Sequence, residues 1–361
     1  MSGKSSICSL KGCVSSLGKA PRQPRMGARG LAKFAMIIAL VPFRLGAAQA
    51  PQQTPAPPPG DDQSVIRVNV DLVNVLFTVR TKKGQLVPDL EKNDFEIYED
   101  GKKQDIQRFS KETDLPVTLG LLIDISASQG RLIDIEREAA AEFFAAVIRK
   151  KDEAFLISFG KSTDLLQDFT NSPRLLSAGL KDLQEDGGGP MVTPGAVPQI
   201  GKLKGTVLFD AVYLASTDKL RGEVGRKALV LVTDGDDQGS FYNVKDAIEQ
   251  AQKSDAIIYS FYYVDPYFYN RMGMMGGEGK GDLQKMSSET GGHVFTVDRK
   301  HTLNDAFKEL QDELRNQYSI GYVPSNTARD GSFRHLEIKV NRPDLVVQAR
   351  KGYYATRSDV Q

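Results

Sequence analysis

The chain has 361 residues, of which 40% are hydrophobic and 26% are charged, and its formal net charge is +1. These are ordinary values for a globular protein, and the length allows one large or two medium-sized domains with a sizeable core. The first fifty residues hold eight basic and no acidic residues, which leaves 39 basic against 46 acidic residues in the remainder. This acidic remainder lacks the basic surplus that nucleic-acid binding requires, and a metal cation suits it better.

The N-terminus has the features of an export signal. An apolar run, LAKFAMIIALVPF at residues 31–43, follows a basic region and is followed by small residues up to Ala50. This order is typical of a secretory signal peptide, here residues 1–50. We expect cleavage after Ala48 rather than after Ala50, because a proline would follow the latter. The basic region is unusually long, so Met26 is an alternative start to the first methionine.

The apolar run is also too short for an ordinary membrane span. We therefore expect a secreted, periplasmic or cell-envelope protein with no stable membrane span in its mature chain; an uncleaved N-terminal anchor is the alternative. Cys8 and Cys13 both precede the run and would leave with the signal peptide. A mature chain without cysteine excludes a disulfide scaffold, a thiol enzyme and a zinc–thiolate site.

Strand-like patterns occur near both ends of the chain. Residues 51–62 form a Pro-rich linker, after which residues 63–115 alternate apolar and polar side chains, with a hairpin turn expected at Asp100-Gly101. Similar alternation returns in residues 316–361. Since neither segment has enough strands for a stable sheet by itself, we predict that the two form a single small β-sandwich.

The intervening residues 116–315 follow another pattern. VTLGLLI, AFLISF and ALVLV have the composition of strands buried on both faces, and helical periodicity separates them. This predicts an α/β fold with a doubly wound, mostly parallel sheet, inserted into the sandwich. Ligands of such sheets bind at the carboxyl ends of the central strands. Helices are expected at residues 131–149, 172–183, 206–220, 243–254, 282–290 and 302–315.

Candidate metal ligands follow the VTLGLLI strand directly. Asp124, Ser126 and Ser128 offer one carboxylate and two hydroxyls at a spacing of two residues. Hard oxygen donors with little charge suit Mg²⁺, Mn²⁺ or Ca²⁺. The spacing alone is equally consistent with hydroxyls that cap the next helix.

Two further segments bring oxygen donors to the same rim of the predicted sheet. Thr206 stands at an expected helix start, where it is also a candidate N-cap, and Asp234 comes just past the ALVLV strand. Asp210 lies one turn into its helix, so we expect it to support the site rather than bind metal. Asp236 and Asp237 either support the site or are merely solvated.

This order of residues resembles the complete metal-ion-dependent adhesion site (MIDAS) of von Willebrand factor A (VWA) domains, over about residues 116–315. The resemblance implies that Mg²⁺, or else Mn²⁺ or Ca²⁺, is bound by Asp124, Ser126, Ser128, Thr206 and Asp234. It also implies that an Asp or Glu of a protein partner completes the coordination. The pieces FEIYEDGK, YSIGY and ARKGYY further resemble exported VWA-related proteins that are abundant in Acidobacteria.

Two glycine-containing segments are ambiguous. Residues 187–205 are rich in Gly and Pro, and residues 266–281 in Tyr, Met and Gly. Each is either a loop beside the metal site or an ordinary connector.

Three functions remain open at this point. The favoured one is a non-enzymatic, metal-dependent module for adhesion or complex assembly outside the cytoplasm. A metal-dependent phosphohydrolase is the second, but no second acid beside Asp124, no nucleophile–His pair and no phosphate-binding loop is evident. The third is a structural VWA protein with a non-functional metal site; a complete ligand set argues against it.

Overall fold

In the computed structural model, Arg67–Gln361 forms one compact unit. Within it, the structure describes residues 72–111, 115–186, 205–273 and 279–355. The predicted signal peptide and Pro-rich linker lie outside the described residues. Among the described helices, none combines the length and the apolar character needed to cross a membrane.

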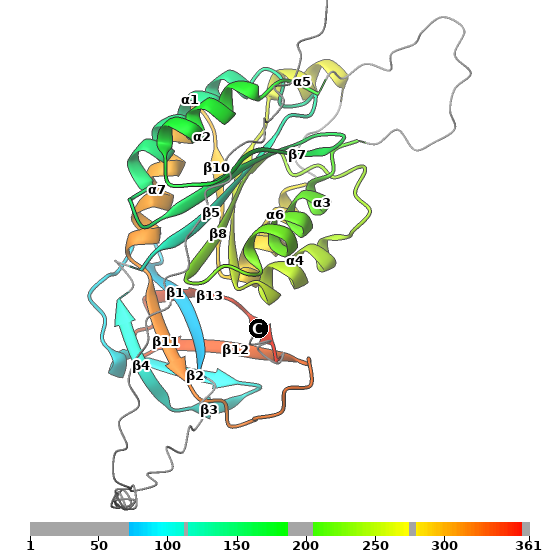
Figure 1. Cartoon of the computed structure of the whole chain (residues 1–361). Helices are drawn as coiled ribbons and strands as arrows, with labels where there is room; N and C mark the ends of the chain where they lie inside the picture. The colour runs from blue at the N-terminus through cyan, green and yellow to red at the C-terminus, as the bar shows by residue number, and fades with distance from the viewer. Residues whose placement is uncertain (1–71, 112–114, 187–204, 274–278, 356–361) are drawn as a thin grey trace, which may run out of the picture. The chain divides into compact units, whose positions relative to one another are not determined.

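A six-stranded sheet forms the centre of the α/β part (Figure 1). Its strands are β5 (Val117–Asp124), β6 (Glu153–Phe159), β7 (Thr163–Thr170), β8 (Arg226–Thr233), β9 (Ala256–Tyr263) and β10 (Val294–Val297). Their order in the sheet is β10-β9-β8-β5-β6-β7, and every neighbouring pair is parallel except β6 and β7. The doubly wound, mostly parallel sheet predicted from the sequence is confirmed.

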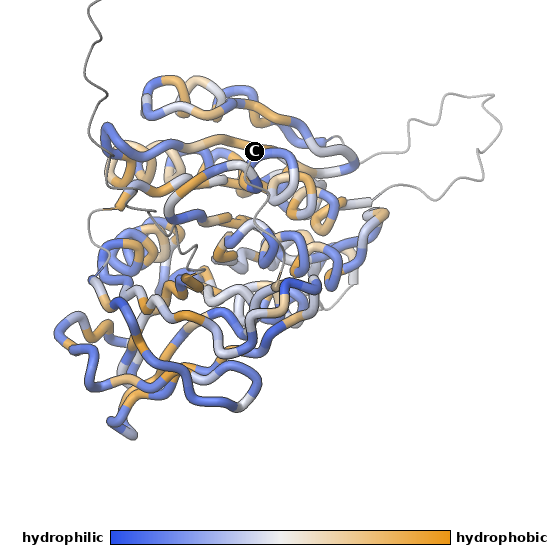
Figure 2. The backbone as a smooth tube through the Cα atoms, turned by 60° about the horizontal axis from the view of Figure 1, so that its bottom comes forward, coloured by the Kyte–Doolittle hydropathy of each residue, from blue (hydrophilic) through white to orange (hydrophobic). Residues whose placement is uncertain are grey.

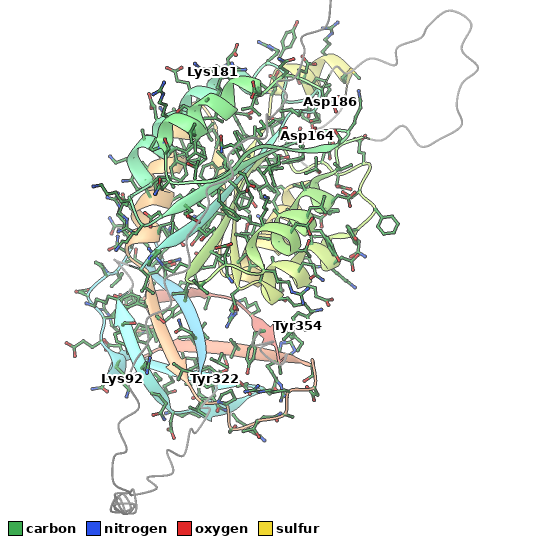
Figure 3. The ribbon with its side chains drawn as sticks, viewed as in Figure 1. Lys92, Asp164, Lys181, Asp186, Tyr322 and Tyr354 are labelled. Atoms are coloured by element: carbon green, nitrogen blue, oxygen red, sulfur yellow. The ribbon has the colours of Figure 1, made fainter. Side chains whose placement is uncertain are left out.

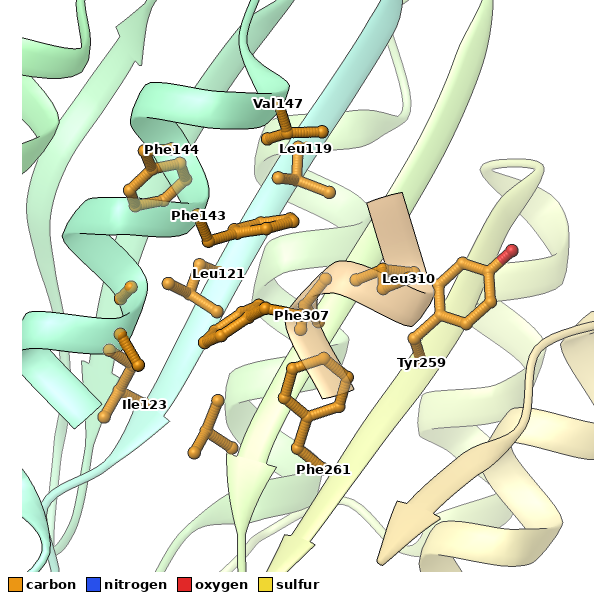
Figure 4. Close-up of a cluster of buried hydrophobic side chains, with 14 of the residues drawn as sticks. Leu119, Leu121, Ile123, Phe143, Phe144, Val147, Tyr259, Phe261, Phe307 and Leu310 are labelled. Atoms are coloured by element: carbon orange, nitrogen blue, oxygen red, sulfur yellow. The ribbon is translucent and has the colours of Figure 1, made fainter. Parts of the chain in front are cut away.

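Helices cover both faces of this sheet. They are α1 (Ile133–Val147), α2 (Pro173–Gly179), α3 (Leu208–Leu214), α4 (Val244–Lys253), α5 (Pro266–Met272), α6 (Lys280–Thr290) and α7 (Leu303–Arg315). One buried apolar cluster joins the sheet to α1, α2 and α7, and a second joins it to α3, α4 and α6. In the first cluster, Phe143 of α1 stacks on Phe307 of α7 with ring centroids 4.4 Å apart, beside Leu121 of β5 (Figure 4). Burial of both faces explains why these strands are continuous apolar runs.

Two helices differ from the prediction. Helix α5 forms within residues 266–281, where the sequence analysis expected no helix, because the Asp265 carboxylate accepts a hydrogen bond from Tyr267 N (3.0 Å) and Pro266 occupies the first turn. Helix α3 begins at Leu208, two residues later than expected, and Val207 is its N-cap. Thr206 is therefore not the N-cap.

The sandwich consists of two four-stranded antiparallel sheets, β13-β1-β11-β4 and β14-β12-β2-β3. Its strands are β1 (Val73–Thr81), β2 (Phe95–Glu99), β3 (Lys102–Gln104), β4 (Ile106–Lys111), β11 (Tyr318–Tyr322), β12 (Phe333–Val340), β13 (Leu345–Ala349) and β14 (Gly352–Tyr354). Strand β1 lies between β11 and β13, and β2 pairs with β12, so both sheets combine N- and C-terminal strands. The predicted pairing of the two ends of the chain is confirmed.

The sandwich core is aromatic and includes one buried acid. Colouring by hydropathy shows apolar and polar residues alternating along the sandwich strands (Figure 2), and the rings of Phe77 and Phe95 meet edge-on at 5.1 Å. Glu99 is 2% exposed and accepts hydrogen bonds from the hydroxyls of Tyr322 (2.6 Å; Figure 3) and Tyr353 (2.9 Å). These bonds offset the cost of burying its carboxylate.

The predicted hairpin turn is also present. Asp100 and Gly101 connect β2 and β3 with φ values of 47° and 78°. Two successive residues with positive φ are what a two-residue hairpin of type I′ requires, and Asp-Gly is a favoured pair there.

Arg226 joins the two places where the chain crosses between the sandwich and the α/β part. It is the first residue of β8 and is 3% exposed. Its guanidinium donates hydrogen bonds to Leu115 O (2.7 Å), to Leu314 O and to Gln317 Oε1 (3.2 Å). Leu115 precedes β5, and Leu314 and Gln317 lie at the end of α7 and just beyond it, so a single side chain holds both crossings.

Replacing Arg226 with Ala should lower the free energy of unfolding by about 3 kcal/mol or more, because the buried acceptors on both crossings lose a charged donor. Urea unfolding followed by far-ultraviolet circular dichroism measures the change. Arg108→Ala, at an exposed position of β4, is the matched control and should change stability by less than about 0.5 kcal/mol. An Arg226→Ala protein as stable as this control would contradict the role assigned to the guanidinium.

Candidate metal centre

The candidate residues gather where the chain order of the sheet reverses. From β5 the chain continues to β6 on one side, while β8 pairs with β5 on the other. Asp124 is the last residue of β5, and Asp234 directly follows β8, whose parallel register sets Val232 opposite Ile123. The carboxyl ends of these two strands therefore meet at one rim, the position at which such sheets bind ligands.

The first loop orients the Asp124 carboxylate through both of its oxygens. Ser126 N donates to Asp124 Oδ1 (2.9 Å), and the Thr233 hydroxyl donates to Asp124 Oδ2 (2.5 Å). The hydroxyls of Ser126 and Ser128 are 3.0 Å apart. Asp124 is fully buried and both serines are partly exposed. The loop thus brings one carboxylate and two hydroxyls together below the solvent-facing rim.

Asp234 is held in a similar way. It is 2% exposed, its Oδ1 accepts from Asp236 N (3.2 Å), and its Oδ2 accepts from the Tyr269 hydroxyl (2.8 Å). Tyr269 is 8% exposed and belongs to α5. Helix α5, at the start of this Tyr- and Met-rich segment, therefore places one side chain against Asp234.

Thr206 reaches the rim through its backbone contacts. Its carbonyl accepts hydrogen bonds from Gln238 N (3.0 Å) and Gly239 N (3.1 Å) in the loop after Asp234. The next residue, Val207, donates from its N–H to Gly160 O (2.9 Å), just past β6. Thr206 itself is 9% exposed. Its segment is therefore fixed between the ends of β6 and β8.

Asp210 stabilises this segment from one turn into α3. Its carboxylate accepts from the backbone N–H groups of Phe241 (2.8 Å) and Tyr242 (2.9 Å). Asp237 makes a comparable link, since its carboxylate accepts from Phe209 N (3.2 Å). Asp236 is partly exposed, and its N–H donates to Asp234. Asp210 and Asp237 thus connect the start of α3 to the loop after β8, whereas the bond from Asp236 N to Asp234 stays within that loop.

The segment 187–204 lies outside the described residues, but its neighbours do not. Asp186, labelled in Figure 3, donates from its N–H to Ile125 O (2.8 Å) in the first loop. At the other end, Gly205 leads directly into Thr206. Both attachment points of this Gly- and Pro-rich segment therefore belong to the candidate centre.

The two buried acids of the site, Asp124 and Asp234, repel each other when both are ionised. Burial, and then the neighbouring Asp234, raise the pKa of Asp124 from its usual value of 3.8 to about 7. Among the described residues, no Lys, Arg or His forms an ion pair with either carboxylate. Two buried carboxylates without a basic partner are the arrangement that a divalent cation would neutralise.

The donor set fits a hard divalent ion. Two carboxylates and three hydroxyls are the oxygen donors that Mg²⁺, Mn²⁺ and Ca²⁺ prefer. Within the described ranges, no group of three or more His, Cys, Asp or Glu side chains is arranged to hold a metal. A metal site here therefore depends on hydroxyl donors.

The sequence analysis did not identify Thr233, Tyr269 or Glu136. Thr233 belongs to the T-D-G motif directly after the apolar run ALVLV. Parallel pairing of this strand with VTLGLLI could therefore have predicted that Thr233 lies opposite Asp124. Glu136 falls in the helical register of Ile133 and Ala140, an acid at a core position of α1. Nothing in the sequence connects Tyr269 to Asp234, because that contact depends on where α5 folds.

Comparisons with known proteins agree with this architecture. The sequence model of the von Willebrand factor type A domain matches residues 119–309, more than half of the chain, and the protein therefore belongs to the VWA family. Domains of this family are generally metal-dependent protein-interaction modules, and most are not enzymes. No curated protein matches the sequence significantly.

Solved structures that match part of the chain were also found. BatB from Bacteroides thetaiotaomicron is 17% identical over 55% of this chain and 97% of that chain, with a TM-score of 0.40. Proximal thread matrix protein 1 from the mussel byssus, with a zinc-occupied MIDAS motif, is 12% identical over 59% and 48% of the two chains, with a TM-score of 0.40. PilB minor pilin from Streptococcus sanguinis is 13% identical over 60% and 64%, with the same TM-score. At these TM-scores the likenesses add nothing to the family assignment.

The raised pKa of Asp124 predicts how the metal-free protein responds to pH. A carboxyl whose pKa is higher in the folded state binds its proton more tightly there, so its contribution to stability is complete below about 3.8 and is lost as the pH rises through about 7. In the presence of a chelator, the free energy of unfolding should therefore fall between about pH 5 and about pH 8. Asp124→Asn should flatten this slope, as urea unfolding at several pH values would measure. An unchanged slope in Asp124→Asn would contradict the assignment.

Proposed function

We propose that this protein is a metal-dependent protein-binding module that holds one divalent cation through Asp124, Ser126, Ser128, Thr206 and Asp234 and grips a carboxylate of a partner protein. The observation that carries the proposal is the pair of buried carboxylates, which share one rim with hydroxyl donors and have no basic partner among the described residues. Mg²⁺, or else Mn²⁺ or Ca²⁺, would supply open coordination positions and positive charge at that rim.

The chain's own residues prepare the two carboxylates for this role. Ser126 N and the Thr233 hydroxyl each bond one oxygen of Asp124, so the orientation of that group is fixed before any ion arrives. Asp236 N and Tyr269 do the same for Asp234. Preorganised ligands lose little conformational entropy on binding, which favours affinity.

The surroundings of the rim suit a protein partner. Phe241 is 88% exposed in the loop that Asp210 anchors, and Tyr267 and Met272 of α5 are 58% and 56% exposed. Aromatic residues and Met are enriched in protein interfaces. The Arg131 guanidinium lies 4.3 Å from the centre of the Tyr267 ring and 3.6 Å from the Asp265 carboxylate, so it also helps to hold α5 at this surface.

Titration calorimetry of the mature chain with MgCl₂ and MnCl₂ tests the metal site. The wild type should bind one ion, and Asp124→Ala should abolish binding while leaving the fold intact or slightly more stable without metal, because one of two repelling carboxylates is removed. Asp89→Ala, at an exposed position of the sandwich, is the charge-matched control and should bind like the wild type. Absence of binding by the wild type at millimolar ion concentrations, even with acetate present, would overturn the proposal.

The wild type and Asp124→Ala, used as immobilised baits in cell-envelope extract with Mg²⁺, then test the partner. A protein that the wild type retains, that chelator elutes and that Asp124→Ala does not retain is expected. Retention that does not depend on the metal would contradict a carboxylate grip.

We also propose that residues 1–50 direct export and that the mature protein is secreted or retained in the cell envelope, as expected for the exported VWA-related proteins of Acidobacteria. The proposed boundaries are a Pro-rich linker at 51–62, the VWA domain at 116–315, and sandwich halves at 63–115 and 316–361. The basic region and apolar run before Ala50 support export.

N-terminal sequencing of the protein from the producing cell should give a mature chain that begins near Gln49 or Pro51. Export removes the segment that contains both cysteines, so the mature protein should also fail to react with thiol reagents after denaturation. A cytoplasmic chain that retains Cys8 would rule the proposal out.

A further inference from the structure

Helix α1 presents an acidic side chain to the core next to the candidate metal centre. Glu136 lies in the inward-facing register of Ile133 and Ala140, which pack in the same apolar cluster as Ile123 of β5. Its side chain is buried, with the whole residue 1% exposed. Both of its carboxylate oxygens lack a hydrogen-bond partner among the described residues.

The electrostatic surroundings of Glu136 oppose its ionisation. Burial, and then the negative charges of Asp124 and Asp234, raise the pKa of Glu136 well above its usual value of 4.5. Gln129, fully buried in the loop after Asp124, donates from Nε2 to Tyr263 O (3.2 Å) and leaves its Oε1 without a partner in the described part of the chain. Successive backbone hydrogen bonds, from Leu132 N to Gln129 O (2.7 Å) and from Glu136 N to Leu132 O (2.9 Å), connect this loop to the turn of α1 that carries Glu136. No described Lys, Arg or His pairs with Glu136.

A buried carboxylate without hydrogen bonds costs several kcal/mol unless it is protonated or a cation compensates it. An apolar residue at this core position would avoid that cost and pack equally well, as its neighbours in the register do. Glu136 is therefore not explained by the packing of α1. The raised pKa favours the protonated form of Glu136 in the metal-free protein, whereas a cation bound between Asp124 and Asp234 would favour its ionised form, because the charges of those two carboxylates act on Glu136.

We infer that Glu136 is an acidic residue beside the metal centre, whose charge strengthens cation binding while the five proposed ligands hold the ion. This inference rests on the proposed function. It adds one acid to the two carboxylates of the proposed ligand set: when a bound cation favours the ionised form of Glu136, three negative charges act on one divalent ion.

Glu136→Gln keeps the shape of the side chain and removes its ability to carry a charge. We expect it to weaken metal binding and to stabilise the metal-free protein. The Mg²⁺ dissociation constant should rise roughly tenfold or more, because attraction between the ion and a nearby buried charge is lost. The metal-free protein should become more stable, because a buried carboxylate without partners is gone. If Glu136 only supported packing, its replacement by Gln would lower the stability of the metal-free protein and leave the affinity for metal unchanged.

The experiment combines calorimetric titration with MgCl₂ and thermal unfolding in chelator for the full mature chain. Glu138→Gln is the matched control: it removes the same charge from an exposed position of the same helix and should behave like the wild type in both assays. Glu136→Met serves as a second variant, with an apolar side chain of similar length. It should show the same two changes as Glu136→Gln.

The outcomes separate this inference from the function on which it rests. A wild type that binds no ion overturns the proposed function itself. A wild type that binds Mg²⁺, together with a Glu136→Gln protein that binds it equally well, overturns only the role of Glu136. Loss of metal-free stability in both Glu136 variants would assign Glu136 to packing and overturn the inference as well.

Discussion

The Arg226 guanidinium is the constraint on which the arrangement of the described chain depends. It bonds the carbonyl oxygens of Leu115 and Leu314, at the entrance and the exit of the α/β part. Because these two points are held together, strands from both ends of the chain can share one sandwich core. The same side chain begins β8, the strand that leads to Asp234 at its other end. One buried cation therefore organises the end of the sheet opposite the rim where the acids gather.

The two ends of the sheet differ in whether their buried charged side chains have partners. At the sandwich end, Arg226 has buried oxygen acceptors around it, and Arg80 pairs with the buried carboxylate of Glu313 at 2.5 Å. At the rim, Asp124 and Asp234 are buried beside one another, and burial and repulsion raise the pKa of Asp124. Buried charges thus have partners of opposite charge or polar acceptors at the junction with the sandwich, while the two carboxylates at the rim lack a basic partner among the described residues.

Much of this could be predicted from the sequence because the signals were local. Apolar runs identified the sheet, the Asp-Gly pair identified the β2–β3 turn, and parallel strands necessarily bring residues that follow them, such as Asp124 and Asp234, to one rim. Helix α5 was missed because residues 266–281 are rich in glycine and its stability depends on the short-range cap from Asp265. The contact of Tyr269 with Asp234 joins segments that no periodicity relates. The helical period of α1 could have predicted that Glu136 is buried. That the charges of Asp124 and Asp234 act on it could not be predicted, because this depends on the tertiary structure.

The interleaved sandwich also determines when the chain can finish folding. Strand β1 pairs with β11 and β13, which are made only after the whole α/β part has been synthesised. Closing so long a connection costs little more entropy than closing a shorter one, provided that the inserted domain has already folded and brought its ends together. Until then both edges of β1 are open, and open edges invite pairing with other chains. Folding of the VWA domain therefore sets the time at which the sandwich can form, because it brings β11 and β13 to the position where they pair with β1.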